Sequence, residues 1–144
     1  MSVLEKELEI SDFNFEFNKK DAVTELTKEF GQQFSISKSV REQHTDTTTI
    51  HPSKLPDGVV FAENEIDVKK TVEICQKFKC PIIPFGVGSS LEGHVNALYG
   101  GISIDLNNMN KILHVSPEDG YAVVQPGVTR EQLNIYLRDT GLFF

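Results

Sequence analysis

Apolar residues recur in the middle of the chain at helical spacing and then give way to short unbroken runs. Four of them follow one another at three- and four-residue steps, which makes one side of a helix apolar: Val68, Val72, Cys75 and Phe78. Asn64 precedes this stripe and is a favoured N-cap residue, and Pro81 ends it because proline has no N–H group to continue a helix. The pattern predicts a helix between Asn64 and Pro81.

Short runs of β-forming residues lie on both sides of that helix. Residues 59–62 are Val-Val-Phe-Ala, an unbroken apolar run typical of a strand covered on both faces, and Ile82 and Ile83 begin another strand. Because strand, helix and strand follow each other closely, we expect a right-handed βαβ crossover on a parallel sheet. Residues 101–105 are expected to add a further strand.

The last third of the chain predicts a hairpin and then a helix. Residues 111–115 and 121–125 have the composition of strands, and the turn sequence Ser-Pro-Glu-Asp-Gly connects them at 116–120. Thr129 and Gln132 have the spacing of a capping box, which predicts the start of a helix.

The N-terminal part is expected to contain one short helix and a long irregular segment. Asn18 is a suitable N-cap for an amphipathic helix that Gly31 would end. Residues 39–56 are polar and rich in threonine, which favours an irregular segment whose histidines, His44 and His51, are exposed. Taken together, the elements predict an α+β fold.

The composition narrows the class of protein. The chain has 144 residues, of which 39% are hydrophobic and 24% charged, proportions that fit one folded domain. Its net charge of -7 argues against a nucleic-acid partner, because neutralising a phosphate backbone requires clustered lysine and arginine. No apolar run approaches the roughly 20 residues of a membrane span. The acidic N-terminus has neither the apolar core of a secretory signal nor the arginine-rich character of a mitochondrial presequence.

Neither the cysteines nor the histidines have the spacing of a metal site, and we expect no metal. Cys75 and Cys80 match neither a C-x-x-C motif nor a zinc site, and we interpret them as reduced, buried thiols. Metal-ligand spacing is also missing among the histidines, which are His44, His51, His94 and His114.

The strongest local signal is the glycine-rich segment at 84–93, Pro-Phe-Gly-Val-Gly-Ser-Ser-Leu-Glu-Gly, which directly follows a predicted strand. Gly86, Gly88 and Gly93 permit left-handed backbone angles, so successive N–H groups can point into one concavity and bind a diphosphate. The two serines of the segment add hydroxyl donors without adding charge. The same spacing also fits a glycine-rich turn that binds no ligand.

Two familiar phosphate-binding motifs are absent from this segment. A dinucleotide-binding G-x-G-x-x-G motif requires glycine at position 91, where the chain has Leu91. A P-loop requires a lysine, and no lysine lies between Cys80 and Asn110. A diphosphate at this loop would therefore be held mainly by backbone N–H groups.

Several blocks of sequence, in a fixed order, resemble one family. They are VREQH at 40–44, PDGVVFAENEIDVKKTVEIC at 56–75, PIIPFGVGSSLEGH at 81–94, GGISIDLNNMNKI at 100–112, SPEDGYAVVQPGV at 116–128 and LRDTGLFF at 137–144. Together they resemble the FAD-linked oxidases with a p-cresol methylhydroxylase-type FAD-binding domain. Within that family they are most similar to the branch of D-lactate dehydrogenase (cytochrome) and the glycolate oxidase D-subunit.

The resemblance implies a domain arrangement and a cofactor, FAD. Residues 39–144 would form part of the FAD-binding domain, with its first βαβ subdomain and the start of a second, mixed or antiparallel sheet, and residues 1–38 an N-terminal helical extension. The implied FAD contacts are Pro84, Phe85, Gly86, Val87, Gly88, Ser89, Ser90 and Leu91 around the pyrophosphate, and Gln125, Pro126 and Gly127 in a later turn. That turn also fits an ordinary connection between strand and helix. Asp105 is interpreted as a turn or cap acceptor.

Some relatives attach FAD covalently through a histidine that directly follows a glycine pair in this loop. Here Ser89 and Ser90 stand at the glycine pair and His94 lies beyond it, so we expect noncovalent FAD and a structural role for His94.

The resemblance also implies an activity. Relatives oxidise a 2-hydroxy acid such as D-lactate and pass electrons to cytochrome c or another acceptor, and they continue beyond the position of Phe144 with the part that binds substrate. We therefore expect a partial chain that is inactive alone, and we assign no catalytic residue. The alternative is a catalytically silent module that binds FAD or another nucleotide. A mitochondrial location is implied by the resemblance only, and a cytoplasmic one is the alternative.

Overall fold

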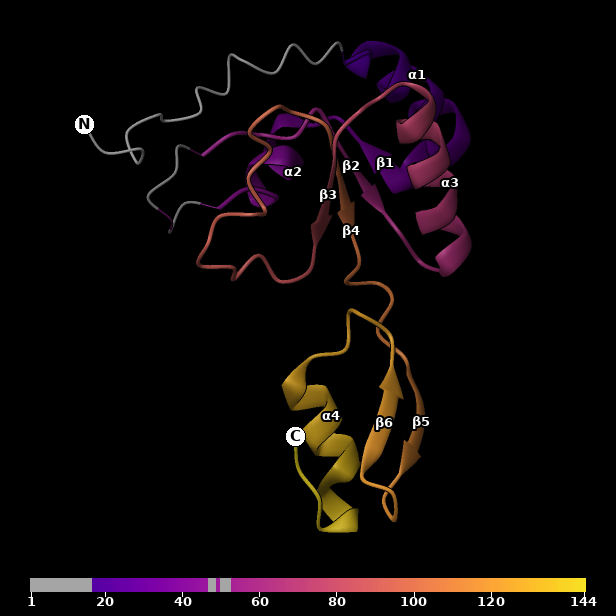
Figure 1. The fold of residues 1–144 in the computed structure, drawn as a ribbon, viewed down its shortest axis with the longest axis vertical. Coiled ribbons are helices and arrows are strands. Elements are labelled where there is room, and N and C mark those ends of the chain that lie inside the picture. Colours follow the sequence, from indigo (N-terminus) through magenta and orange to yellow (C-terminus); the bar gives the residue numbers. More distant parts are fainter. Residues whose placement is uncertain (1–16, 47–48, 50–52) are drawn as a thin grey trace, which may run out of the picture.

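The structure is a computed structural model that describes residues 17–46, 49 and 53–144. The helices are α1 (Lys19–Phe30), α2 (Lys38–Gln43), α3 (Glu65–Lys77) and α4 (Arg130–Leu137), with 3-10 turns η2 (Gly31–Gln33) and η3 (Arg138–Thr140). The strands are β1 (Phe34–Ser35), β2 (Gly58–Phe61), β3 (Ile82–Phe85), β4 (Ile102–Asp105), β5 (Ile112–Ser116) and β6 (Tyr121–Val124). Figure 1 shows one group built on β1 to β4 and a second made of β5, β6 and α4. The α+β prediction is confirmed.

The first group contains a four-stranded sheet in the order β1-β2-β4-β3. Strands β2 and β3 both run parallel to β4, with Gly58 and Ile82 each opposite Ile102, whereas the short β1 pairs antiparallel with β2. The predicted strand–helix–strand unit is present, with β4 inserted between the two strands that α3 connects. The parallel strands end at one edge of the sheet, where the glycine-rich loop begins.

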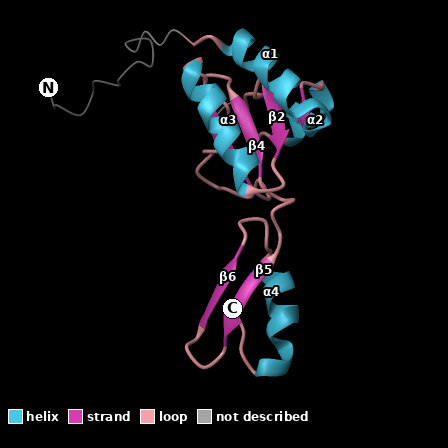
Figure 2. Ribbon diagram, turned by 90° about the vertical axis from the view of Figure 1, so that its right-hand side faces the viewer, coloured by secondary structure: helices cyan, strands magenta, loops and turns pink. Residues whose placement is uncertain are grey.

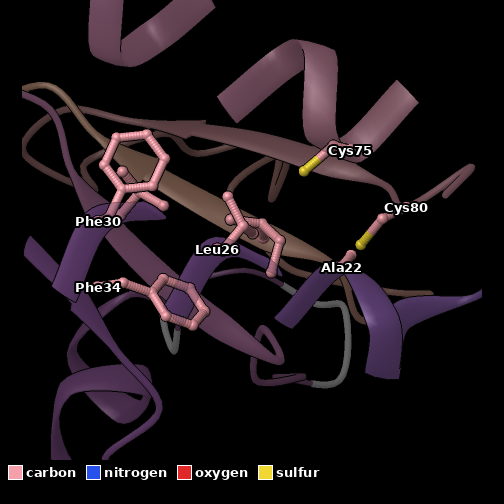
Figure 3. Close-up of a cluster of buried hydrophobic side chains, with 8 residues drawn as sticks. Ala22, Leu26, Phe30, Phe34, Cys75 and Cys80 are labelled. Atoms are coloured by element: carbon pink, nitrogen blue, oxygen red, sulfur yellow. The ribbon is translucent and has the colours of Figure 1, made fainter. Parts of the chain in front are cut away.

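Helices α1 and α3 lie side by side over one face of this sheet (Figure 1, Figure 2). The main core lies between them and the strands (Figure 3) and consists of Ala22, Leu26, Phe30, Phe34, Val60, Cys75, Cys80 and Ile102. The two cysteines are free and buried, as predicted, and the hydrogen bond with Cys80 together with burial raises the pKa of the Cys75 thiol. Residues on both sides of position 38 contribute to this core, and the domain boundary there stays a prediction.

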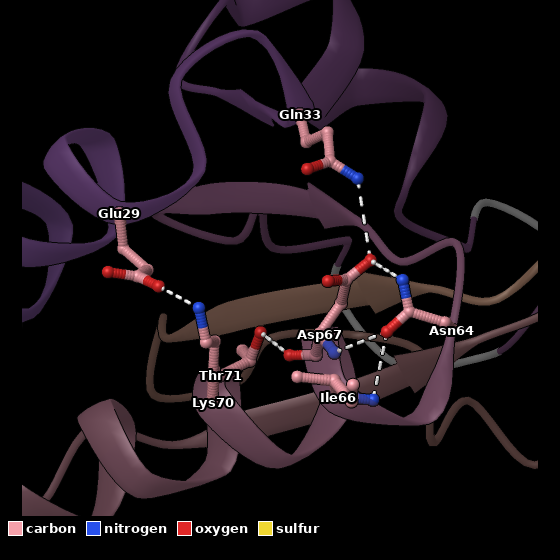
Figure 4. Close-up of polar contacts among 7 residues, drawn as sticks. All are labelled: Glu29, Gln33, Asn64, Ile66, Asp67, Lys70 and Thr71. Carbon is pink, nitrogen blue, oxygen red and sulfur yellow. Dashed lines mark hydrogen bonds and ion pairs between the residues drawn. The ribbon is translucent and has the colours of Figure 1, made fainter.

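The N-cap of α3 is the one predicted from the sequence (Figure 4). The side-chain oxygen of Asn64 accepts hydrogen bonds from the N–H groups of Ile66 at 2.9 Å and Asp67 at 3.1 Å. The Asp67 carboxylate in turn accepts from the Asn64 amide at 3.1 Å and from the N–H of Glu63 at 3.0 Å. Asn64 and Asp67 thus provide acceptors for N–H groups both inside the first turn of α3 and just before it.

Asn64→Ala is expected to lower the free energy of unfolding by about 1 kcal/mol, because two helical N–H groups lose their acceptor. Urea denaturation followed by circular dichroism measures the change. Asn18→Ala is the matched control, since Asn18 accepts a single bond of 3.4 Å, from the N–H of Asp21, at the start of α1. A control variant that loses as much stability as Asn64→Ala would contradict this role of the cap.

The second group is the predicted hairpin followed by the predicted helix. Strands β5 and β6 pair antiparallel, and Leu133 and Leu137 of α4 are buried. The Thr129 hydroxyl accepts the N–H of Gln132 at 3.1 Å, which confirms the N-cap. The Gln132 side chain does not complete the capping box, because it donates to the Asn110 carbonyl at 2.8 Å and so ties α4 to the segment before β5.

The prediction of an irregular segment over residues 39–56 is wrong in its first part. Helix α2 spans Lys38–Gln43, and Arg41 fixes it by donating to the carbonyls of Ile36 and Pro56 at 3.1 and 3.2 Å. The expectation that His44 is exposed is also wrong, since the residue is 4% exposed. The same expectation for His51 lies outside the described residues. Tertiary contacts, which a polar sequence does not reveal, determine this part of the fold.

Candidate functional site

The glycine-rich loop begins directly after β3, and its first half faces solvent. Residues 86–92 are exposed or half-buried, and Val87 and Leu91 are 70% and 78% exposed. Among the residues that the structure describes, no backbone N–H group from Gly86 to Leu91 donates a hydrogen bond. Backbone donors need an acceptor, and these exposed groups have none in the described part of the protein. They are therefore available to an external acceptor.

Both ends of this exposed stretch are fixed to the rest of the protein. At its start, the Gly86 carbonyl accepts a hydrogen bond of 2.8 Å from the side-chain amide of Asn107. Beyond its end, Asn96 is buried, and its side-chain oxygen accepts from the Thr45 hydroxyl at 2.7 Å and the Asp46 N–H at 3.2 Å. Anchors on both sides preorganise the N–H groups between them and reduce the entropy cost of binding.

Gly88 determines the backbone shape of the exposed stretch. Its φ is +71°, and a Cβ atom at this position would lie 2.8 Å from the ring of Phe85. A Cβ atom at Gly86, whose φ is not positive, would meet nothing within 4 Å. The left-handed geometry that the sequence permits at three glycines is therefore adopted at Gly88 and at Gly93, where φ is +76°.

A buried polar pair lies under the start of the loop, where the parallel strands end. The Nε2 atom of His44, after α2, lies 2.9 Å from the Asp105 carboxylate at the end of β4, and its Nδ1 atom lies 2.8 Å from the Val40 carbonyl oxygen. The rings of Phe61 and Phe85 pack against the imidazole, with centroid distances of 5.7 and 4.5 Å. Side chains from β2, β3 and β4 thus meet around the His44 ring, and Asp105 of β4 makes the polar contact with it.

Asn107 connects this pair to the loop. Its N–H group and its side-chain amide both donate to Asp105 Oδ1 at 2.8 Å, and the same side-chain amide donates to the Gly86 carbonyl. The interpretation of Asp105 as a turn acceptor is confirmed. Its second role, as the partner of His44, was not predicted.

The contacts within the pair favour the charged form of both members. Burial alone lowers the pKa of His44, but the hydrogen bonds to Asp105 and to the Val40 carbonyl, with the charge of Asp105, outweigh it and raise the pKa above the ordinary 6.5. Burial alone raises the pKa of Asp105, but the contacts with His44 and Asn107 outweigh it and place the pKa below the ordinary 3.8. Both shifts favour an imidazolium–carboxylate pair at this buried contact.

The turn Gln125–Gly127 packs on the residues after β4 from the other side. The Gly127 N–H donates to the Met109 carbonyl at 2.8 Å, and a Cβ atom on Gly127 would lie 2.5 Å from the Leu106 carbonyl oxygen. The close approach that requires glycine at this position is therefore to the chain's own backbone. Asn107 lies among the residues after β4 and also donates to the Gly86 carbonyl of the loop. The two predicted contact segments, the loop and the turn Gln125–Gly127, therefore both contact residues 106–109.

Other predicted contact residues have partners inside the protein. Pro84 and Phe85 belong to β3, and Phe85 is 7% exposed with its ring against His44, which leaves its side chain little access to a ligand. The Gln125 side chain accepts the N–H of Lys111 at 2.9 Å. These residues shape the surroundings of the exposed amides.

His94 lies in the second half of the loop, with its Nδ1 atom 3.1 Å from the Ser90 hydroxyl. Within residues 17–46, 49 and 53–144, no cluster of three or more His, Cys, Asp and Glu side chains is arranged to hold a metal ion. In the same part of the chain, no helix has both the length and the apolar character needed to cross a membrane.

Two hollows on the described part of the surface lie away from the loop. One of about 700 Å³ is open to solvent along α1 and is lined mainly by charged side chains, which are Asp21, Glu25, Lys28 and Glu29. Another, of about 140 Å³, lies between the hairpin and α4 and is lined largely by apolar side chains such as Leu133 and Phe144. Neither offers a group of free donors, so the loop is the candidate anion site.

Comparison with known proteins gives consistent matches. The sequence pattern of the FAD binding domain family matches residues 56–144. The chain is 46% identical over 110 residues to a probable mitochondrial D-lactate dehydrogenase of Danio rerio, a match that covers 76% of this chain and 22% of that protein. It is 41% identical over 90 residues to the mitochondrial D-lactate dehydrogenase (cytochrome) of Arabidopsis thaliana, covering 62% and 16%. The crystal structure of p-cresol methylhydroxylase with substrate bound matches with a TM-score of 0.75 at 26% identity, covering 85% of this chain and 25% of that one.

The chain spans about a fifth of the length of the curated relatives that it matches. The family match includes both the glycine-rich loop and the turn Gln125–Gly127. The exposed N–H groups of the loop, which have no acceptor in the described part of the chain, are donors of the kind that can bind an anion such as a diphosphate. The family and the cofactor that the sequence blocks implied are thus confirmed. The chain belongs to the FAD binding domain family of FAD-dependent oxidoreductases.

Proposed function

We propose that the chain binds FAD noncovalently, with the N–H groups from Gly86 to Leu91 as the main donors to the pyrophosphate. One observation carries the proposal: these N–H groups have no acceptor in the described part of the chain, although both ends of the stretch are anchored. Ser89 and Ser90 would add hydroxyl donors at the same place. Pro84, Phe85 and the turn Gln125–Gly127 would border the site.

For the whole protein we propose a flavin-dependent dehydrogenase of a 2-hydroxy acid, with D-lactate as the first candidate and a mitochondrial location. Support comes from the identity of 46% and 41% to proteins that are named mitochondrial D-lactate dehydrogenases. FAD, when bound, would supply the electron acceptor for oxidation of the carbon that bears the hydroxyl group. The residues of this chain would bind and orient the cofactor, and none of them is assigned a catalytic role.

The proposal is tested with flavin absorbance. We expect the purified chain, mixed with FAD and passed through a gel-filtration column, to retain a flavin band, and acid denaturation to release all of the flavin because no covalent bond holds it. Anaerobic D-lactate is expected to bleach the band of the whole protein and to leave that of this chain unchanged. Flavin that bleaches in neither would favour the silent binding module, and loss of the band on the column would contradict FAD binding by this chain.

A further inference from the structure

Both ring nitrogens of His44 face atoms that accept hydrogen bonds. Nδ1 lies 2.8 Å from the Val40 carbonyl oxygen, and Nε2 lies 2.9 Å from the carboxylate of Asp105. A neutral imidazole has one N–H group, whereas a charged one has two. The other oxygen of Asp105 already accepts two hydrogen bonds from Asn107, which favours the ionised carboxylate. With Asp105 ionised, both ring nitrogens face acceptors, so the geometry favours an imidazolium at His44.

This charged pair is connected to the loop by direct contacts. Asp105 ends β4 and is held by Asn107, whose side chain also donates to the carbonyl of Gly86, the first residue of the exposed stretch. Phe85, the residue before Gly86, packs its ring against the imidazole. A change in the charge of His44 thus acts on the residues that fix the start of the loop.

Within the described part of the chain, Asp105 is the charged side chain that contacts the His44 ring. Asp105 contributes from β4, the contacts from β2 and β3 are the uncharged rings of Phe61 and Phe85, and Asp46 is buried two residues further along the chain. The charged residues of α2 are exposed or half-buried, and they are Lys38, Arg41 and Glu42. Loss of the His44 proton would remove the positive charge beside the buried Asp105 carboxylate and leave one ring N–H group to serve two acceptors.

We propose that His44 and Asp105 are positioning residues for FAD: the charged pair, acting through Asn107 and Gly86, holds the loop in its binding shape, and FAD binds more tightly when His44 is protonated. The inference rests on the proposed function and adds a buried, pH-dependent support beneath the phosphate site.

The same pair makes stability depend on pH. Because the pKa of His44 is raised by folding, its contribution to stability is complete below about pH 6.5 and is lost as the pH rises through the raised pKa. Because the pKa of Asp105 is lowered by folding, its contribution is present above about pH 3.8 and is lost as the pH falls through the lowered pKa. Thermal melts of the chain without FAD, recorded over a range of pH, measure the loss of stability at high pH and at low pH.

The test follows the imidazole signal of His44 by NMR. The sequence has four histidines, and the signal of His44 is identified as the one that is missing from the spectrum of His44→Gln. We expect FAD to raise the pKa of His44 by about one unit, and the affinity for FAD, followed by flavin fluorescence, to fall about tenfold between the protonated and the deprotonated limits. Linkage makes these two changes equal.

Three variants separate positioning from a merely structural role. His44→Gln is expected to bind FAD more weakly and with a flat pH profile, whereas His114→Gln, on the exposed side of the hairpin, is expected to keep the affinity and the profile of the original chain. Asn107→Ala is expected to preserve the titration of His44 but to remove the effect of FAD on it.

Two results would overturn the inference while leaving the proposed function intact: FAD binding that does not change the pKa of His44, or His44→Gln with an unchanged affinity and pH profile. Absence of FAD binding at every pH would overturn both the proposed function and this inference. The titration of His44 without FAD remains measurable in each case, so the charge state of the pair is tested independently.

Discussion

Gly88→Val is expected to abolish FAD binding by this chain, with an affinity at least about a hundredfold lower, the equivalent of roughly 2.7 kcal/mol. A β-branched side chain is strained at a φ of +71°, and its Cβ atom would lie 2.8 Å from the Phe85 ring. The backbone between Gly86 and Leu91 would have to change shape, and its N–H groups would lose the arrangement that we propose for binding the pyrophosphate. Fluorescence titration with FAD measures the loss, and circular dichroism verifies that the chain remains folded.

Two further glycine variants separate backbone strain from contact with the ligand. Gly120→Val introduces strain at a similar φ of +69° in the hairpin turn, where a Cβ atom meets nothing within 4 Å, and it is expected to leave the affinity for FAD unchanged. At Gly86 an added Cβ atom meets nothing within 4 Å and φ is not positive, so we expect weaker FAD binding by Gly86→Val to come from obstruction of the ligand. Unchanged affinity in both Gly86→Val and Gly88→Val would contradict the phosphate site.

Gly127→Ala is expected to lower the free energy of unfolding by about 3 kcal/mol, because its methyl group would be forced against backbone atoms that cannot move independently. The added Cβ atom would lie 2.5, 2.7 and 2.9 Å from the carbonyl oxygens of Leu106, Asn107 and Met109. The turn Gln125–Gly127 would have to move away from residues 106–109, which connect the two groups of elements. Urea denaturation measures the change.

Gly86→Ala is the matched control for stability, since its methyl group meets nothing within 4 Å, and it is expected to change the free energy of unfolding by less than about 0.5 kcal/mol. The two variants together also decide whether the turn Gln125–Gly127 needs its glycine for packing or for the cofactor. Gly127→Ala with normal stability but weak FAD binding would show that the cofactor requires the glycine, and it would contradict a packing role at this position.

The regular elements with strong local signals could be predicted from the sequence. The cap at Asn64, the apolar run at 59–62 and the turn at 116–120 each determine their element through neighbouring residues, and the structure has α3, β2 and the β5–β6 hairpin at these places. Helix α2 and strand β1 were missed because they are short and depend on distant contacts. Phe34 of β1, for example, is held by pairing with Val60.

The loop could be located from its glycines, but the groups that support it could not. His44 and Asp105 are 61 positions apart, and nothing in a single sequence indicates that they meet. The polar surroundings of His44 favoured exposure, although the fold places the residue between two phenylalanine rings. A partial signal was present at the end of β4, where Asp105 followed by Asn107 is typical of a side-chain-stabilised turn.

The N–H groups from Gly86 to Leu91 can be observed directly by ¹⁵N NMR while FAD is added to the purified chain. We expect their signals to shift and their hydrogen exchange to slow, because each donor gains a phosphate acceptor, and we expect riboflavin, which has no diphosphate, to leave them unchanged. Signals that stay in place at saturating FAD, with all shifts confined to other residues, would contradict a pyrophosphate site in this loop.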